Sequence, residues 1–265
     1  PNKNEVVAID KQIAITDWSL LDEVLEFFPK PTYPVLFKEH IVEDLRYILA
    51  LWWFTLFERH WSLRGMANAL MDYYTDPECV HRLFRALTDF YIAMIIRAKK
   101  EADVDGIMIS DDLGTQNGPF FSLDIFREFF KPYYKEIFDT VHSLGMHVWM
   151  HACGNIEQFI PELIEIGLNV LHPVQKHAMD VSKIAQVYAD KLCFFVGLDV
   201  QQTIPWGTPD DVRAEVRYLI DTFQRPGGRL IITAGNGING DCSLENLEAF
   251  FDECFKYGSS IVIQA

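Results

Sequence analysis

A chain of 265 residues is long enough to bury the core of one barrel-sized domain. Its net charge of -15 argues against binding to nucleic acid and to anionic membrane surfaces, because both bind proteins through Lys and Arg. The same charge argues against a highly anionic substrate, unless the site has a local basic pocket. Five cysteines without a CxxC pair indicate reduced thiols and a cytoplasmic setting. The sequence shows neither a signal peptide nor a long uncharged apolar stretch, so we expect a soluble protein.

The amino-terminal part of the sequence has no long hydrophobic period. Residues 1–45 are expected to form an irregular arm, with one short helical pattern from Asp17 to Phe27. A short apolar and aromatic run over 47–53 predicts a buried strand. Apolar residues at helical spacing predict a helix over 56–74, and Asp76-Pro77 starts another that runs to about Ala102.

Strands and helices alternate from residue 106 onward. Strands are expected at 106–110, 148–150, 169–171, 192–196 and 230–233, and helices at 123–144, 156–166, 181–188, 209–223 and 244–257. This alternation is typical of βα units on a parallel sheet, either an open doubly wound sheet or a (β/α)8 barrel. A Gly-rich GxGxxG turn is missing, and polar residues follow nearly every strand, which favours the barrel. Six strands are counted where eight are needed, and residues 260–264 are either a late strand or a packed tail.

His151 and Cys153 form the most informative pair in the sequence. They stand two residues apart at the end of an apolar strand that Gly154 terminates, so their side chains point the same way. A nitrogen and a sulfur donor therefore lie side by side at the carboxyl end of a strand, where α/β enzymes keep their chemistry. Metal binding is one interpretation, and packing in the core is the other.

Further polar residues follow the neighbouring strands. Adjacent carboxylates at Asp111 and Asp112 repel, so one is expected to titrate high or to hold a cation, unless Asp112 merely caps its loop. His172 and Gln175 add an imidazole and an amide, with a structural role for the His equally open. Asp199 has no helix to cap in the sequence, which favours a functional role.

Three other stretches have narrower interpretations. Thr208 and Asp211 predict a helix cap and are structural. The glycine-rich loop 235–240 allows close approach of the backbone to a ligand, but it lacks the Lys-Ser/Thr of a phosphate loop. Glu58 and Arg59 lie between a strand end and a helix, where they either face the site or form a surface pair.

Taken together, these stretches resemble the uroporphyrinogen decarboxylase superfamily, which also contains corrinoid-linked methyltransferases. The pieces that carry the resemblance span roughly residues 46–258 in the family's order: Phe54-Thr55-Leu56, Arg64-Gly65-Met66, Asp111-Asp112 with Gly114 and Gln116, Arg127 to Tyr134, His151 to Asn155, His172 to Gln175, Gly197-Leu198-Asp199, and Gly235 to Asn246. The resemblance implies an α/β fold, a (β/α)8 TIM barrel in a single domain over 1–265. It also implies that about two strands precede residue 46 in the family, so the chain is expected to lack about two N-terminal strands.

The resemblance implies one of two chemistries. The decarboxylases act on a tetrapyrrole with many carboxylates, without a metal. The methyltransferases hold zinc with a His-x-Cys pair and a later Cys, and they move a methyl group between a corrinoid cobalt and a thiol or methoxy substrate. His151 and Cys153 match the first two ligands. The third ligand falls on Asn236. Cys242, six residues on, is the candidate substitute, and packing in the first turn of the following helix is the equal alternative.

The expected function is therefore a zinc-dependent methyltransferase that works with a corrinoid (methylcobalamin) carried by a partner protein. One form of this function is a component of an aromatic O-demethylase. The alternative is a metal-independent carboxy-lyase of tetrapyrrole metabolism. The expected site residues are Asp111, Asp112, His172 and Asp199 for catalysis, Trp52, Phe54, Glu58, Gln116, Gln175 and Asn236 for substrate binding, and His151, Cys153 and Cys242 for metal. A small-molecule substrate is expected, nucleic acid and membrane are not, and a homodimer is compatible with this assignment.

Overall fold

The structure, a computed structural model, describes residues 13–32, 46–226 and 229–262. The chain divides into two compact units, and each is described by itself. The first unit holds the residues up to Asp112 together with 120–148 and 161–167, and the second holds 113–119, 149–160 and the residues from Leu168 onward. Within the described ranges, no helix is both long enough and apolar enough to cross a membrane.

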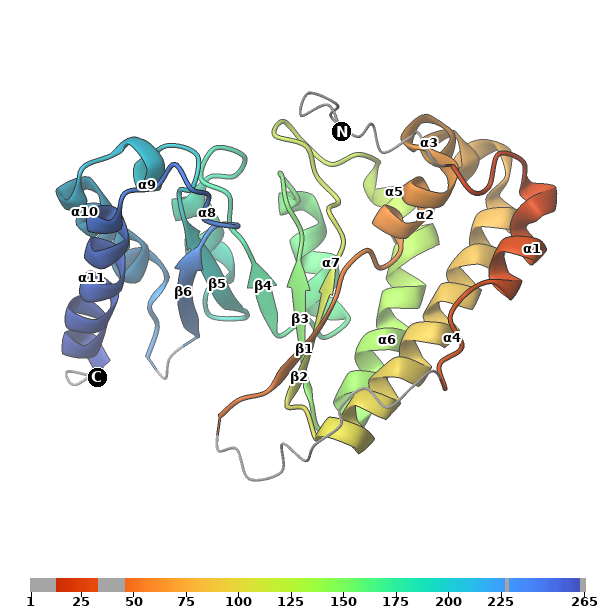
Figure 1. The fold of residues 1–265 in the computed structure, drawn as a ribbon, viewed down its shortest axis with the longest axis horizontal. Coiled ribbons are helices and arrows are strands. Elements are labelled where there is room, and N and C mark those ends of the chain that lie inside the picture. The colour runs from red at the N-terminus through yellow and green to blue at the C-terminus, as the bar shows by residue number, and fades with distance from the viewer. Residues whose placement is uncertain (1–12, 33–45, 227–228, 263–265) are drawn as a thin grey trace. The chain divides into compact units, whose positions relative to one another are not determined.

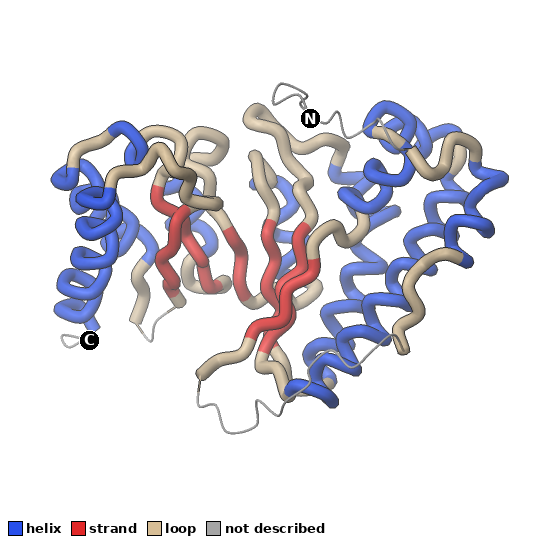
Figure 2. Tube along the Cα trace, viewed as in Figure 1, coloured by secondary structure: helices blue, strands red, loops and turns tan. Residues whose placement is uncertain are grey.

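Strands and helices alternate along the chain (Figures 1 and 2). The strands are β1 (Leu49–Trp52), β2 (Gly106–Ser110), β3 (His147–His151), β4 (Val170–His172), β5 (Cys193–Leu198) and β6 (Leu230–Ala234). The helices are α1 (Leu21–Glu26), α2 (Phe57–Arg64), α3 (Met66–Thr75), α4 (Pro77–Ala102), α5 (Leu123–Ile125), α6 (Lys131–Ser143), α7 (Ile160–Glu165), α8 (Val181–Tyr188), α9 (Thr203–Trp206), α10 (Pro209–Phe223) and α11 (Leu244–Val262). Short 3-10 turns are η2 (Trp18–Leu20) and η4 (Glu157–Phe159), and η3 (Phe126–Phe130) is a π-helical turn.

The order of the strands confirms the predicted fold class. Hydrogen bonds link the strands in chain order, β1-β2-β3-β4-β5-β6, and the pairs within each unit are parallel. Parallel neighbours in chain order, with helices between them, are the connectivity of a (β/α) barrel. Six strands lie in the described part of the chain, the number expected from the sequence, and closure of the barrel stays a prediction.

The first unit contains the most accurately predicted helix. Asp76 stands at the N-cap of α4 and Pro77 at its first position, where the fixed φ of proline suits a helix start. The helix ends at Asp103, whose φ of 47° is left-handed, as is common just after a helix. Its buried residues recur at helical spacing, so the amphipathic pattern over 77–102 was sufficient to predict it.

Four sequence expectations differ from the structure. The strand over 47–53 was expected to be buried, but β1 is only half-buried, and Tyr47, Leu51 and Trp53 are exposed. The single helix expected over 56–74 is two helices, because Gly65 between α2 and α3 has a φ of 80°. The helix expected over 123–144 contains the π-helical turn η3. Pro132 follows it, and since proline cannot donate to the carbonyl four residues back, a wider turn is accommodated there. Of the two alternatives for residues 260–264, the late strand is wrong up to Val262, where α11 ends, and 263–265 lie outside the described residues.

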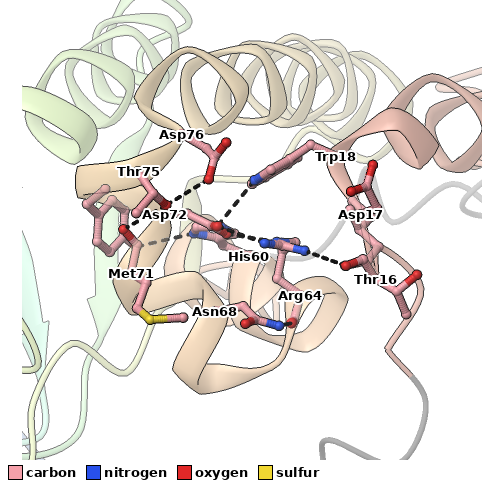
Figure 3. Close-up of polar contacts among 12 residues, drawn as sticks. Thr16, Asp17, Trp18, His60, Arg64, Asn68, Met71, Asp72, Thr75 and Asp76 are labelled. Atoms are coloured by element: carbon pink, nitrogen blue, oxygen red, sulfur yellow. Dashed lines mark hydrogen bonds and ion pairs between the residues drawn. The ribbon is translucent and has the colours of Figure 1, made fainter.

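A buried ion pair fastens the amino-terminal segment to α2 and α3 (Figure 3). Both oxygens of Asp72 accept from Arg64, at 2.8 Å each. Arg64 also donates to the backbone carbonyls of Ile15 (2.9 Å) and Thr16 (3.2 Å), and the Trp18 indole donates to Asp72 at 3.2 Å. The predicted arm over 1–45 is therefore attached to the first unit where it is described, and it carries the helix expected from Asp17 to Phe27 as η2 and α1.

The neutral ring of His60 completes this cluster. Burial lowers the pKa of His60, so the ring donates from Nε2 to Asp72 (3.2 Å) and accepts from the Tyr73 hydroxyl at Nδ1 (3.3 Å). Burial alone would raise the pKa of Asp72, but the hydrogen bonds from Arg64 and His60 outweigh it and lower the pKa to about 2. Asp72 is thus a buried carboxylate that accepts hydrogen bonds from Arg64, His60 and Trp18.

Replacing Asp72 by Asn is expected to lower the free energy of unfolding by roughly 3–5 kcal/mol, since it leaves the buried Arg64 without its counter-charge. Because the folded pKa of Asp72 is depressed to about 2, its contribution is present above the unfolded value of about 3.9 and is lost as the pH falls toward 2. The difference from wild type in urea unfolding should therefore shrink between pH 4 and 2.

The matched control is Asp22→Asn, which breaks the exposed pair that Asp22 forms with Arg82. Exposed pairs contribute about 0–1 kcal/mol, so this variant should unfold almost as wild type does. Equal effects of the two substitutions would show that the buried cluster does not fasten the segment.

The second unit is organised by close backbone contacts between its strands. In the β5–β6 pair, Gly197 lies opposite Thr233, and a Cβ atom on Gly197 would stand 1.8 Å from the Cα of Gly235. Glycine is therefore required at this crossing. At the start of α10, Thr208 and Asp211 form the predicted capping box.

Candidate functional site

Two imidazoles and a thiol meet at the carboxyl ends of β3 and β4 in the second unit. His151 stands opposite His172 in the parallel register of these strands, and their Nδ1 atoms lie 2.7 Å apart. Two residues further along, Cys153 places its Sγ 3.3 Å from the Nε2 of His151. The structure thus brings together three of the residues predicted for the site.

The contact between the two Nδ1 atoms requires that one of them carries a proton and the other accepts it. Burial, together with the charge of His151, lowers the pKa of His172 to about 4, so its ring is neutral near pH 7. When His172 accepts at Nδ1, His151 donates from Nδ1 and its Nε2 presents a lone pair toward Cys153, as a zinc ligand requires.

The Nε2 of His151 and the Sγ of Cys153 have the chemistry and spacing of zinc ligands. Tetrahedral zinc takes nitrogen at about 2.0–2.1 Å and sulfur at about 2.3 Å, which separates the two donor atoms by about 3.6 Å. The observed separation is 3.3 Å. A ligating His commonly donates its second N–H to a group that fixes the ring, and His172 is such a group. This donor pair therefore fits zinc.

The third ligand expected from the sequence does not join the pair. The Sγ of Cys242 lies 3.6 Å from the carbonyl oxygen of Ile204. The amide nitrogen of Asn236 lies 3.8 Å from the Sγ of Cys153, while its amide oxygen accepts the N–H of Gly237. Among the described residues of the second unit, no three His, Cys, Asp or Glu donors lie within 4.8 Å of one another. This unit therefore supplies two of the three protein ligands usual in catalytic zinc sites.

The turn after Cys153 depends on a glycine and an amide. Gly154 has a φ of 84°, and a Cβ atom on it would lie 2.2 Å from the carbonyl oxygen of Gly114, so no other residue fits. The side-chain oxygen of Gln175 accepts the N–H of Gly154 at 2.7 Å. Gln175, expected to bind substrate, thus also supports the turn that carries Cys153.

A cavity of the second unit begins beside the pair. Its volume is about 100 Å³, smaller than the roughly 300–1,000 Å³ that sites for drug-sized ligands occupy. Its lining consists of Gln116, residues 173–177 and 197–201, Gly235 and Asn236. Since Asn236 also contacts Cys153, the cavity adjoins the proposed ligand pair.

The walls of this cavity give little support to a polyanionic ligand. Its one Lys, Lys176, forms an ion pair with Glu215 at 3.0 Å, and the walls also carry the carboxylate of Asp199. Arg is absent from the described residues that line it. A molecule with several carboxylates would therefore find too few cations in this cavity.

Asp199 has partners that the sequence did not indicate. Its Oδ2 lies 2.9 Å from the Nε2 of His177, and its Oδ1 accepts the backbone N–H groups of Gln201 (2.8 Å) and Gln202 (3.2 Å). Burial would raise the pKa of Asp199, but these hydrogen bonds outweigh it and lower the pKa. Asp199 thus holds the turn before α9, whose N-cap is Gln202 without a side-chain cap, and its predicted functional role stays a prediction.

In the first unit, Asp111 anchors the amino end of α2. Its two oxygens accept the backbone N–H groups of Leu56 (2.8 Å), Phe57 (2.9 Å) and Glu58 (2.7 Å), and the Tyr134 hydroxyl donates at 2.5 Å. Burial still raises the pKa of Asp111 to about 6, against these hydrogen bonds. The anchoring role is established by these contacts, and the predicted catalytic role stays a prediction.

Glu58 is a buried acid beside Asp111. Burial, together with the charges of Asp111 and Asp112, raises the pKa of Glu58 to about 8, so its carboxyl group is mostly protonated at pH 7. The Ser110 hydroxyl donates to it at 3.2 Å, and the backbone N–H of Asp112 also donates to it. The predicted roles of Glu58 and Asp112 stay predictions.

Two aromatic residues predicted to bind substrate also belong to the first unit. Trp52 ends β1 and is half-buried. Phe54 has a left-handed φ of 62°, and the guanidinium carbon of Arg59 lies 5.6 Å from the centre of its ring. A positive φ on an aromatic residue is a strained conformation, but nothing in the first unit tests its contact with a substrate.

Comparison with known families identifies the chain. The family model described as Uroporphyrinogen decarboxylase (URO-D) matches residues 54–257, well over half of the sequence. The chain belongs to the uroporphyrinogen decarboxylase family. The matched range includes every residue that the sequence assigned to the site except Trp52.

Curated members of the URO-D family similar to this chain fall into two groups of enzymes. The Methylcobamide:CoM methyltransferase MtbA of Methanosarcina mazei is 27% identical over 183 residues, which are 69% of this chain and 50% of that protein. The uroporphyrinogen decarboxylase of Chlorobium phaeobacteroides is 25% identical over 204 residues, 73% of this chain and 55% of that protein. The chain thus spans about half the length of the curated relatives it matches.

A solved structure supports the fold of this URO-D family member. A methyltransferase from Methanosarcina mazei superposes with a TM-score of 0.65 and 17% sequence identity, covering 82% of this chain and 60% of that one. At this identity the similarity establishes the fold alone.

His177 is the site residue that sequence reasoning missed. It lines the cavity and contacts Asp199, but a single His in a loop has no spacing that distinguishes it from a surface residue. The contact between His151 and His172 was equally invisible, because the register of β3 against β4 is set by tertiary packing. The family match explains why polar residues follow the strands, and the geometry explains what each of them contacts.

Proposed function

We propose that this chain is a zinc-dependent methyltransferase that exchanges a methyl group between a corrinoid, carried by a partner protein, and a small thiol or methoxy compound. The observation that carries the proposal is the His151 and Cys153 donor pair, with its Nε2 to Sγ distance of 3.3 Å and with the Nδ1 of His151 2.7 Å from the Nδ1 of His172. A metal-independent decarboxylase has no use for a nitrogen and a sulfur donor oriented in this way.

Two further observations support methyl transfer. A relative that is 27% identical carries the name of a methylcobamide methyltransferase. The cavity whose lining residue Asn236 contacts Cys153 contains one Lys, and this Lys is already paired. The proposal further includes a cytoplasmic setting, a homodimer and an aromatic O-demethylase activity.

His151 and Cys153 would hold the metal ion in this proposal. When bound, zinc supplies a Lewis acid that lowers the pKa of a thiol or polarises a methoxy oxygen. His172 keeps the His151 ring in the tautomer that presents Nε2, and Gln175 holds the turn that carries Cys153. The cavity walls would orient the substrate beside this pair.

The roles of the predicted catalytic residues divide accordingly. His172 is neutral near pH 7 because its pKa is about 4, so we assign it to orienting His151. Asp199 orients His177 through the contact at 2.9 Å. Asp111 and Asp112 remain candidates for proton transfer in the first unit, together with the buried acid Glu58 whose pKa is about 8.

The second candidate function is decarboxylation of a porphyrinogen-like polycarboxylate. The decarboxylase relative, 25% identical over 73% of this chain, favours it. This reaction would proceed without metal, and it would not depend on the thiol of Cys153.

One pair of assays separates the two functions. The zinc-loaded protein is incubated with methylcobalamin and 2-mercaptoethanol in one assay, and with uroporphyrinogen in the other. We expect the thioether in the first, abolished by Cys153→Ser, and no loss of carboxylate in the second. Decarboxylation that is unchanged in Cys153→Ser, without methyl transfer, would replace the proposed function by the alternative.

Substitutions at His172 test the orienting role assigned to it. His172→Leu is expected to raise the zinc dissociation constant by about 10–100-fold, the usual effect of removing a partner that orients a ligand. His172→Gln keeps an acceptor for the Nδ1–H of His151, so its dissociation constant should stay within a few-fold of wild type. Competition with a chromophoric chelator measures both constants, and an unchanged value in His172→Leu would remove the role.

A further inference from the structure

The cavity of the second unit contains one imidazole that the proposed zinc chemistry does not use. His177 lies in the loop after β4, with about 40% of its side chain exposed. Its Nε2 lies 2.9 Å from the Oδ2 of Asp199, whose side chain is 4% exposed. The exposed ring is therefore attached to a buried carboxylate, on the wall of a cavity that reaches Cys153 through Asn236.

Several hydrogen bonds fix the position of Asp199, and Asp199 therefore fixes the orientation of the His177 ring. Its second oxygen accepts the backbone N–H groups of Gln201 and Gln202, and its own N–H donates to Glu215 at 3.1 Å. These hydrogen bonds keep Asp199 ionised at neutral pH, as its lowered pKa indicates. The carboxylate accepts the Nε2–H of His177, which fixes the tautomer with Nδ1 as the acceptor.

The charged groups beside His177 are one carboxylate and one lysine that is already paired. Asp199 contacts the ring directly. The preceding residue, Lys176, is paired with Glu215, which also accepts from the Thr203 hydroxyl at 2.5 Å. The positive charge of Lys176 is thus offset. A buried Asp that orients an exposed His is the arrangement of a general base.

We propose that His177 is the proton-transferring catalytic residue of this cavity and that Asp199 is its positioning residue, acting on the small thiol that the proposed function includes. This inference rests on the proposed function. The Nδ1 of His177 takes the proton of the thiol, and the sulfur forms a bond to the methyl carbon. The bond between methyl carbon and cobalt of the methylated corrinoid breaks with its electron pair left on cobalt. The products are a thioether, a corrinoid reduced by two electrons and protonated His177.

A comparison of two thiols tests the proton transfer. With methylcobalamin and 2-mercaptoethanol, His177→Gln is expected to lower kcat by about 10²-fold or more, the usual contribution of a general base, with zinc content and KM for the thiol unchanged. With pentafluorothiophenol, which is already a thiolate at assay pH, the loss should shrink to a few-fold. Asp199→Asn should follow the same pattern, and added imidazole should partly rescue His177→Ala.

Each alternative outcome has a distinct meaning. His147→Gln, at the amino end of β3, is the control and should behave as wild type. If His177→Gln is as active as wild type, or is slowed equally with both thiols, the inference is overturned while the proposed function stands. If the wild-type protein transfers no methyl group to either thiol, the inference fails, and methyl transfer from a methoxyarene to the corrinoid then decides whether the proposed function stands.

Discussion

A Cys153→Ser variant is expected to bind zinc at least about 100-fold more weakly than the wild-type protein, and His151→Ala should do the same. The second unit supplies these two donors, 3.3 Å apart, and zinc prefers a thiolate to the neutral hydroxyl of Ser. Mass spectrometry of the metal content after dialysis, with chelator competition for the dissociation constant, measures the effect.

Cys242→Ser is the sharpest comparison for this prediction. The sequence favoured Cys242 as the third ligand, whereas the structure places its Sγ beside the carbonyl oxygen of Ile204. We therefore expect Cys242→Ser to keep its zinc. Cys193→Ser, in β5, is the control for losing a thiol anywhere in the second unit. If Cys242→Ser loses zinc as completely as Cys153→Ser, the ligand set drawn from the structure is wrong.

Gly197→Ala is expected to disrupt the second unit. The added Cβ would lie 1.8 Å from the Cα and 2.4 Å from the N of Gly235, and backbone atoms cannot turn aside as a side chain does. β5 and β6 must separate, which we expect to cost more than about 3 kcal/mol, beyond the usual range for overpacking. Hydrogen exchange should show lost protection in β5 and β6, and the cavity that these strands help to form should bind ligands poorly.

Gly118→Ala is the matched control within the same unit. A Cβ at Gly118 meets nothing within 4 Å, so its stability should change by no more than about 0.5 kcal/mol. Full protection of β5 and β6 in Gly197→Ala would contradict the close approach of the two strands.

The sequence predicted the fold well because local signals agreed with one another. The proline after Asp76 and the apolar period over 77–102 marked α4, and Thr208 with Asp211 marked the start of α10. The elements that were predicted incorrectly depend on backbone dihedral angles, which the amino-acid composition does not reveal. The left-handed φ at Gly65 divides one predicted helix, and a short apolar run at the end of α11 has no period that separates a helix from a strand.

The site was predicted in part, and the limit has a physical cause. His151 and Cys153 were found because they are two residues apart on one strand, where sequence spacing determines direction. The contacts of His151 with His172, and of His177 with Asp199, join different strands and loops. Their geometry depends on strand register and on the course of loops, so no spacing in the sequence reveals them.

X-ray absorption at the zinc edge of the purified protein tests the central claim most directly. A zinc ion held by His151 and Cys153 predicts a nitrogen shell at about 2.0–2.1 Å and a sulfur shell at about 2.3 Å, with the sulfur shell lost in Cys153→Ser. Zinc surrounded by oxygen and nitrogen alone, or a sulfur shell that survives in Cys153→Ser, would contradict it.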